Sequence, residues 1–192
     1  REAINGHLLA LPIFHVMGLT SAWATFISGG KNVLLKQFEE KLAVQLIDAE
    51  QLTYFGSFPP VLERVLDSAK ESGSGLESLK LVYGLEGLQN IQRLHEETSA
   101  VFWTGFGQSE TTAFVTASPA AERPGASGQA TLLNTVAVVD EIDQQLPCGE
   151  EGEIVVRGEN IFLEYWKMPE ATVYAQRNSW HHTGDIGRFD ED

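Results

Sequence analysis

The chain has 192 residues, of which 43% are hydrophobic and 9% aromatic, enough apolar material for one sizeable core or two small ones. Its 13 Lys and Arg against 27 Asp and Glu give a formal net charge of −14, which disfavours nucleic acid and anionic membrane surfaces as partners. No apolar run approaches the ~20 residues of a membrane-spanning helix, and no signal-peptide cleavage site is apparent, so we expect a cytoplasmic protein without a membrane span. The single cysteine, Cys148, is interpreted as structurally incidental.

The sequence up to about Gly105 alternates short apolar runs with segments of helical spacing. Strands are predicted at 8–11, 33–35, 52–55, 79–83 and 101–103. The segments between them have helix-like patterns, at 20–27, 39–49, 59–69 and 88–98. Nearly continuous hydrophobic strands separated by amphipathic helices indicate a parallel sheet that is covered on both faces.

Beyond residues 119–128 the helical period gives way to β-branched runs. Strands are predicted at 135–139, 154–156 and 186–189, and a helix only at 169–175. Turn signals separate the strands, as in a small barrel or sheet. We therefore predict an α/β fold, with a mainly parallel sheet flanked by helices at 1–118 and a small β-rich, barrel-like lobe at 119–192.

The segment Thr104–Thr112, with the sequence TGFGQSETT, follows the last predicted parallel strand. Ligands of open α/β sheets bind beyond the carboxyl ends of such strands. Phe106 offers a stacking face, Ser109 a hydroxyl donor, and Glu110 an oxygen ligand suited to Mg²⁺. The alternative is a polar turn capped by Ser109, in which Glu110 compensates a helix dipole.

Two other segments carry polar candidates. In WHHTGD, Asp185 follows a glycine and can accept hydrogen bonds from two ribose hydroxyls, although Gly-Asp pairs more often form plain turns. The adjacent His181 and His182 point apart in an extended chain and have no third ligand at a zinc spacing, which disfavours a metal site. In LPIFHVMG, the lone His15 after the first strand is more often structural than catalytic.

The chain contains no GxxxxGK[ST], GxGxxG, GxSxG or HExxH motif. P-loop ATPases, Rossmann dehydrogenases, α/β-hydrolases and zincins therefore have no support in the sequence.

Four motifs, taken together and in this order, resemble those of the adenylate-forming acyl-CoA synthetases, a family of AMP-binding ligases. They are LPIFHVMG, TGFGQSETT, GEIVVRG and WHHTGD, and the resemblance runs from Leu8 to Asp192. It implies that a small carboxylic acid attacks the α-phosphate of ATP with Mg²⁺ as cofactor, giving an acyl-adenylate and pyrophosphate. The thiol of CoA then displaces AMP to give the acyl-CoA.

The resemblance also implies roles for individual residues. Phe106 would lie against adenine, Ser109 would contact the α-phosphate, Glu110 would bind Mg²⁺, and Asp185 would hold the ribose hydroxyls. His15 would lie near the phosphate and the reacting carboxylate, so the implied catalytic residues are His15, Ser109 and Glu110. The implied nucleotide-binding residues are Gly84, Leu85, Glu86, Gly87, Gly105, Phe106, Gly107, Ser109 and Asp185.

The sequence departs from the family pattern at the adenine loop. Tyr83–Leu88 lacks the proline of the usual Gly-Gly-x-Pro sequence and carries Glu86 instead of a neutral residue. The family's phosphate loop should precede Leu8 and its lysine-bearing lobe should follow Asp192, and neither is found in the chain. We therefore expect a fragment of a ligase that is inactive by itself.

The apolar residues Met17, Phe114 and Val115 next to the motifs favour a smooth acyl pocket. A fatty acid is the preferred substrate and an aryl acid the next. Two alternatives remain open: an amino-acid adenylation module, which would need an Asp for the substrate ammonium, and a non-catalytic nucleotide-binding or interaction module.

Overall fold

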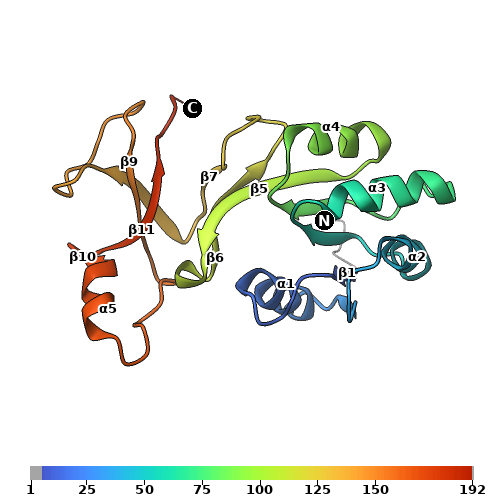
Figure 1. Ribbon diagram of the computed structural model, residues 1–192, viewed down its shortest axis with the longest axis horizontal. Coiled ribbons are helices and arrows are strands. Elements are labelled where there is room, and N and C mark those ends of the chain that lie inside the picture. Colours follow the sequence, from blue (N-terminus) through green and yellow to red (C-terminus); the bar gives the residue numbers. More distant parts are fainter. Residues whose placement is uncertain (1–5, 192) are drawn as a thin grey trace. The chain divides into compact units, whose positions relative to one another are not determined.

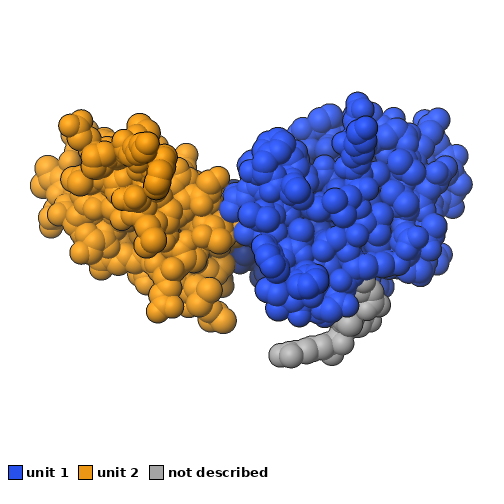
Figure 2. All heavy atoms as spheres, turned by 90° about the horizontal axis from the view of Figure 1, so that it is seen from below, with its two compact units in different colours: residues 1–105, 117–128 blue, residues 106–116, 129–192 orange. Residues whose placement is uncertain are grey.

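The computed structural model describes residues 6–191, which form two compact units (Figure 2). The first unit comprises the chain up to residue 105 together with 117–128, and the second comprises 106–116 and 129–192. A division of the sequence at residues 118 and 119 stays a prediction. Among the described residues, no helix is both long and apolar enough to cross a membrane.

The first unit is built on parallel strands. Its strands are β1 (Gly6–Leu9), β2 (Lys31–Leu34), β3 (Tyr54–Ser57), β4 (Leu81–Gly84) and β5 (Val101–Gln108). They belong to a seven-stranded sheet of order β2-β1-β3-β4-β5-β6-β7, in which each neighbouring pair from β2 to β5 is parallel. The helices between them are α1 (Val16–Ile27), α2 (Glu40–Glu50), α3 (Val61–Ser72) and α4 (Leu88–Glu97) (Figure 1). The prediction of a mainly parallel sheet flanked by helices is confirmed.

The two faces of this sheet are covered differently. Leu8, Phe55, Val82 and Phe102 are direct neighbours across four strands, and all are fully buried against α2, α3 and α4. Because side chains alternate along a strand, Tyr54 points to the other face, where its hydroxyl is hydrogen-bonded to α1. The helices α3 and α4 can be followed on one side of the sheet and α1 on the other in Figure 1.

The second unit contains a separate four-stranded antiparallel sheet of order β10-β11-β9-β8. Its strands are β8 (Asn134–Val139), β9 (Gly152–Gly158), β10 (Gln176–Arg177) and β11 (Trp180–Gly187), and α5 (Pro169–Ala175) precedes β10. Its apolar core is small and consists of Ala137, Val139, Val155 and Trp180. The carboxyl end of β5, a single turn of 3₁₀ helix at Ser109–Thr111, most of β6 (Ala113–Pro119) and β7 (Gln129–Ala130) also lie in this unit.

Several strand boundaries differ from the prediction, and two of the differences place candidate motifs within strands. Strand β5 does not end at Trp103 but continues to Gln108, so most of TGFGQSETT is extended. Gly107 permits this, because a Cβ there would lie 1.9 Å from the carbonyl oxygen of Ala113 in β6. Strand β11 begins at Trp180 instead of near residue 186, so WHHTGD lies within a strand. Glycines that suggested turns are here sites of close strand approach or of a local irregularity.

Candidate functional site

The loop after β4 holds the four residues expected near adenine. Gly84 has a φ of +139° and is buried, and a Cβ on it would lie 2.0 Å from the carbonyl oxygen of Ser57 at the end of β3. Only glycine fits this position. Glu86 accepts hydrogen bonds from Ser57 Oγ at 2.7 Å and from Asn90 Nδ2 at 3.3 Å. The acid that departs from the family pattern therefore ties this loop to β3 and α4, while Leu85 and Gly87 are exposed.

His15 is the N-cap of α1. Its Nδ1 accepts a hydrogen bond from the backbone N–H of Met17 at 3.2 Å, and its exposed ring lies edge-on to Phe58 at 6.4 Å. Because Nδ1 is the acceptor, the proton of the neutral imidazole lies on Nε2, where it can be donated to an anionic oxygen. The structural role therefore uses one ring nitrogen and leaves the other for binding. The Met17 side chain is buried.

In the second unit, Gln108 and Thr111 shape the turn that carries Ser109 and Glu110. The N–H of Gln108 donates to Thr111 Oγ1 at 2.8 Å, and the Thr111 hydroxyl also contacts the carbonyl oxygen of Ala113 at 2.8 Å. This buried threonine closes the turn from inside and leaves Ser109 exposed and Glu110 half-buried. The alternative of a turn capped by Ser109 is wrong in this respect, since the N-cap of the 3₁₀ turn is Gln108.

The side chain of Gln108 joins two motifs that are 77 residues apart. Its Nε2 donates to Asp185 Oδ2 at 2.7 Å and to the carbonyl oxygen of Thr183 at 2.8 Å. Its Oε1 lies 3.2 Å from Nε2 of His181, whose pKa is lowered mainly by burial. Asp185 itself is exposed. The part of TGFGQSETT from Phe106 onward and WHHTGD are therefore held together within the second unit. The Asp185 carboxylate is exposed to solvent beside the turn that carries Ser109.

Glu110 is held by two hydrogen bonds from the segment before α5. The hydroxyl of Tyr165 donates to Glu110 Oε1 at 2.9 Å, and the N–H of Phe162 donates to the Glu110 carbonyl at 2.8 Å. Burial and the nearby carboxylate both raise the pKa of Tyr165, so this phenol stays a donor at neutral pH. Within residues 6–191, no three His, Cys, Asp or Glu side chains gather closely enough to hold a metal. One positioned carboxylate still suits Mg²⁺, which takes its other ligands from substrate phosphates and water.

The predicted residues are distributed over both units. The first unit holds His15, Met17, Gly84, Leu85, Glu86, Gly87 and Gly105. The second unit holds Phe106, Gly107, Phe114, Val115, Ser109, Glu110 and Asp185. Phe106 and Phe114 are half-buried, and the N–H of Phe106 donates to Thr116 Oγ1 at 2.9 Å. Val115 is fully buried, so its surface contacts protein atoms.

Three residues of the second unit that make key contacts had no role in the sequence-based prediction. They are Gln108, Tyr165 and Glu153, and Glu153 lies opposite WHHTGD in strand β9. Gln108 and Glu153 belong to motifs that carry the family resemblance, TGFGQSETT and GEIVVRG, which was the available signal. Nothing local in the sequence points to Tyr165.

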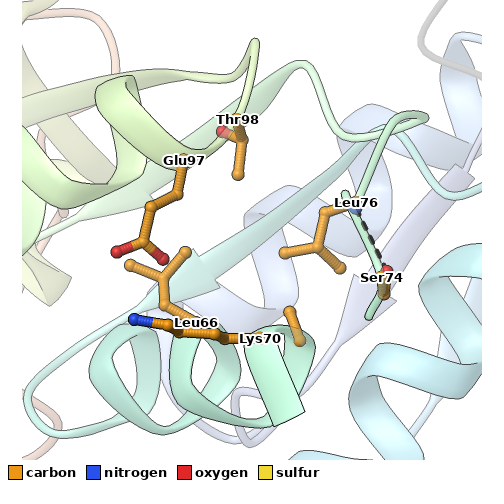
Figure 3. A pocket seen from close by; sticks show the side chains of 7 residues that line it. Leu66, Lys70, Ser74, Leu76, Glu97 and Thr98 are labelled. Atoms are coloured by element: carbon orange, nitrogen blue, oxygen red, sulfur yellow. Dashed lines mark hydrogen bonds between the residues drawn. The ribbon is translucent and has the colours of Figure 1, made fainter. Parts of the chain in front are cut away.

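A surface hollow of about 290 Å³ lies elsewhere in the first unit (Figure 3). Leu66 and Lys70 of α3, Leu76 in the following loop, and Glu97 and Thr98 at the end of α4 line it. The loops that contribute to it lead into β4 and β5, so it lies at the amino ends of these strands, whereas the candidate residues follow their carboxyl ends. None of its lining residues is a predicted site residue.

Comparison with known proteins supports the family resemblance. Residues 5–166 match the family model described as AMP-binding enzyme. A solved structure of a putative long-chain-fatty-acid CoA ligase from Rhodopseudomonas palustris is 42% identical, with a TM-score of 0.95, over 99% of this chain and 48% of that chain.

Two curated relatives extend the comparison. The medium/long-chain-fatty-acid–CoA ligase FadD8 of Mycobacterium tuberculosis is 30% identical over 96% of this chain and 34% of its own length. A feruloyl-CoA synthase of Amycolatopsis is 27% identical over 96% of this chain and 39% of its own length. The chain thus spans less than two fifths of the length of either relative.

Proposed function

Since this chain belongs to the AMP-binding enzyme family, we propose that it forms part of an AMP-forming ligase that activates a carboxylic acid with ATP and transfers the acyl group to CoA. The relatives that it matches are ligases and synthases of acyl- and aryl-CoA. A fatty acid is the proposed substrate, because the relative with 42% identity carries that description, and an aryl acid is the next choice. For contacts to the acyl chain we propose the half-buried Phe114 of the second unit and, in the first unit, Met17, whereas the side chain of Val115 is fully buried in this structure.

The observation that carries the proposal is the contact between Gln108 and Asp185. It supports a nucleotide site in which the Asp185 carboxylate accepts hydrogen bonds from the ribose hydroxyls. Gln108 Nε2 occupies one lone pair of Oδ2 and thereby fixes the rotation of the carboxylate, which leaves Oδ1 and the outer lone pair of Oδ2 for a diol. Phe106, in the same unit, would supply the stacking face for adenine.

Ser109 and Glu110 would face the phosphates. The exposed Ser109 hydroxyl can donate to the α-phosphate, and the half-buried Glu110 carboxylate, oriented by Tyr165, can hold Mg²⁺. When bound, Mg²⁺ would neutralise charge on the phosphate oxygens. His15 would donate a hydrogen bond from Nε2 to the reacting carboxylate or phosphate, and Gly84–Gly87 with Gly105 and Gly107 would let the backbone approach the nucleotide.

AMP binding by the 192-residue chain tests the nucleotide site. An NMR titration of the amides should give a dissociation constant no tighter than roughly millimolar, because stacking and a few charged hydrogen bonds are offset by association entropy. Asp185→Ala should abolish binding. Asp48→Ala, which makes the same substitution on the exposed face of α2, should leave it unchanged.

The positions of the shifted signals decide the assignment. Signals that move should belong to residues 105–110 and 183–186. If Asp185→Ala binds AMP as well as the parent chain does, the assignment of the ribose site is wrong. Glu110→Gln should weaken binding of ATP in the presence of Mg²⁺ and leave binding of AMP in its absence unchanged, which separates the phosphate end of the site from the ribose end.

A further inference from the structure

Strand β11 has an irregularity next to Asp185. His182 pairs with Val155 of β9, but Ile186 pairs with Glu153, so the segment between them contains two residues more than a regular ladder would. These extra residues lie in Thr183–Asp185, where Gly184 has a φ of +75°. Such bulges re-aim a side chain, and here the bulge turns the Asp185 side chain out to solvent.

The side chain of Glu153 fills the gap that the bulge leaves in the hydrogen-bond ladder. Its Oε1 accepts the backbone N–H of Gly184 at 3.0 Å. Its Oε2 accepts from Nδ1 of His182 at 2.8 Å and from a guanidinium nitrogen of Arg177 at 3.3 Å. A side-chain carboxylate therefore takes the place of a strand carbonyl directly beside Asp185, and each of its oxygens is engaged.

The surroundings of Glu153 keep its carboxylate ionised. Burial by itself would raise the pKa of Glu153, but the hydrogen bonds from His182 and Gly184 and the charge of Arg177 together hold it below its ordinary value. Asp143 shares the Arg177 guanidinium at 3.2 Å. A charged acceptor makes a stronger hydrogen bond to the Gly184 N–H than a neutral carbonyl would.

His182 is oriented by the same contact. A carboxylate can only accept, so the short contact with Glu153 requires a proton on Nδ1 of His182. The side chain is 2% exposed, and its Nε2 has no hydrogen-bond partner among the described residues; the nearest carboxylate oxygen is that of Asp143 at 3.9 Å. A buried nitrogen without a hydrogen bond lowers stability, so we interpret the orientation of this ring as set by its hydrogen bond to Glu153.

We propose that Glu153 is a positioning residue, which clamps the Thr183–Asp185 bulge through the Gly184 N–H and so aims the Asp185 carboxylate at the ribose. The inference rests on the proposed function for the role of the ribose and on the hydrogen bonds of Glu153 for the clamp. Gln108 also holds the bulge, through the carbonyl of Thr183 and the carboxylate of Asp185, so two side chains fix its position.

The test is Glu153→Gln, which keeps the length of the side chain and removes its charge. We expect the affinity for AMP to fall at least fivefold and the affinity for 2′,3′-dideoxy-AMP, which lacks the hydroxyls, to change less than twofold. Glu151→Gln is the matched control. It makes the same substitution at the residue directly before β9, where the side chain is 68% exposed.

Two outcomes would overturn the inference. The first is an unchanged AMP affinity in Glu153→Gln, and the second is an equal loss of affinity for both nucleotides, which would indicate general destabilisation. If Glu153→Gln does not fold, Glu153→Asp replaces it, which keeps the charge but is one methylene shorter. This variant should likewise lose affinity for AMP and keep its affinity for 2′,3′-dideoxy-AMP.

A readout without nucleotide separates this inference from the proposed function. In Glu153→Gln, the Gly184 amide proton should move upfield and the signal of the Asp185 side-chain carboxyl should shift, whereas Glu151→Gln should leave both in place. Unmoved Gly184 and Asp185 signals would refute the clamp even if AMP binds. If these signals move while Asp185→Ala leaves AMP binding intact, the clamp stands and the proposed ribose site fails.

Discussion

Each of the two units is stabilised internally by a different kind of contact. In the first unit, Leu8, Phe55, Val82 and Phe102 form a row of fully buried side chains across four parallel strands. In the second unit the apolar core is small, and directional polar contacts such as that between Glu153 and Gly184 fix the segments that carry the candidate site. Apolar burial needs only the right residue type on the right face, whereas each polar clamp needs a particular atom at a particular distance.

Each unit also buries at least one histidine, and His7 of the first unit and His182 of the second make different contacts. His7 is stacked on Tyr54 with ring centroids 4.4 Å apart, and its ring nitrogens contact the uncharged Asn32 and Tyr83. His182 donates to a carboxylate instead. The same residue type therefore contributes a neutral packing element to the first unit and part of an ionic clamp to the second.

The largest effect is expected from removing a side chain of the apolar row. Phe102→Ala should lower the free energy of unfolding of the first unit by ~3–5 kcal/mol, because it leaves a cavity in addition to losing buried area. Hydrogen exchange of the amides of β3, β4 and β5, followed together with urea unfolding, measures this loss. Phe14→Ala, the same change at a side chain that is 92% exposed, should cost less than ~0.5 kcal/mol. Equal losses for the two variants would contradict the description of the first core.

The same contrast explains what the sequence predicts. On α3, Leu62, Val65 and Leu66 recur on one face, and all three are buried as the pattern requires. The parallel order of the strands follows from such patterns, because apolar runs and amphipathic helices leave few other ways to bury both faces of a sheet. The fold of the first unit was therefore predictable from local sequence.

The candidate site was predictable only in part. The motifs that contain Ser109, Glu110 and Asp185 were found from their residue types and from the family resemblance, but the bond that unites them, between Gln108 and Asp185, spans 77 residues and has no local signature. Strand β5 was predicted to end at Trp103 because glycines resemble turn residues, whereas Gly107 is needed where β5 and β6 approach closely. Polar contacts and close approaches depend on the finished fold, which a local pattern does not contain.

The buried His7 should make stability depend on pH. Burial, partly opposed by the hydrogen bond to Asn32, lowers the pKa of His7 from 6.5 to about 4. As pH falls, His7 is protonated in the unfolded chain before it is protonated in the folded one. The contribution of neutral His7 to the free energy of unfolding is therefore complete above pH 6.5 and is lost progressively down to about pH 4. The loss amounts to about 3 kcal/mol, since each pKa unit corresponds to about 1.4 kcal/mol.

Urea unfolding at several pH values between 4 and 7 measures this dependence. His7→Gln should flatten it by about the stated amount relative to the parent chain. His15→Gln should lower stability at every pH by removing the cap of α1, but should keep the difference between pH 4 and pH 7. A parent chain and a His7→Gln variant with the same pH dependence would show that His7 is not the buried neutral group described above.

Two glycines at candidate loops should respond differently to substitution. Gly84→Ala in the first unit places a Cβ 2.0 Å from a backbone oxygen, whereas Gly184→Ala in the second meets no atom within 4 Å and costs only the strain of a positive φ. We expect Gly184→Ala to lose ~1 kcal/mol of stability, Gly184→Asn less, and Gly84→Ala clearly more. Thermal unfolding of the three variants gives the order. A Gly184→Ala loss as large as that of Gly84→Ala would place an unseen contact at the bulge.

The smallest effect is expected at an exposed ion pair of the second unit, and it sharpens the contrast with the clamp. Glu151 and Arg188 lie 3.2 Å apart with side chains that are 68% and 61% exposed, so water and salt screen them, and a double-mutant cycle should give a coupling of less than ~0.5 kcal/mol. Glu153 and Arg177 are also 3.3 Å apart, but they are only 22% and 30% exposed and share further partners. Their coupling should be larger, ~0.5–3 kcal/mol, and should persist in 0.5 M salt. If both pairs couple equally weakly, the partial burial of Glu153 and Arg177 does not strengthen their interaction, and Arg177 does not support the clamp that Glu153 forms with Gly184.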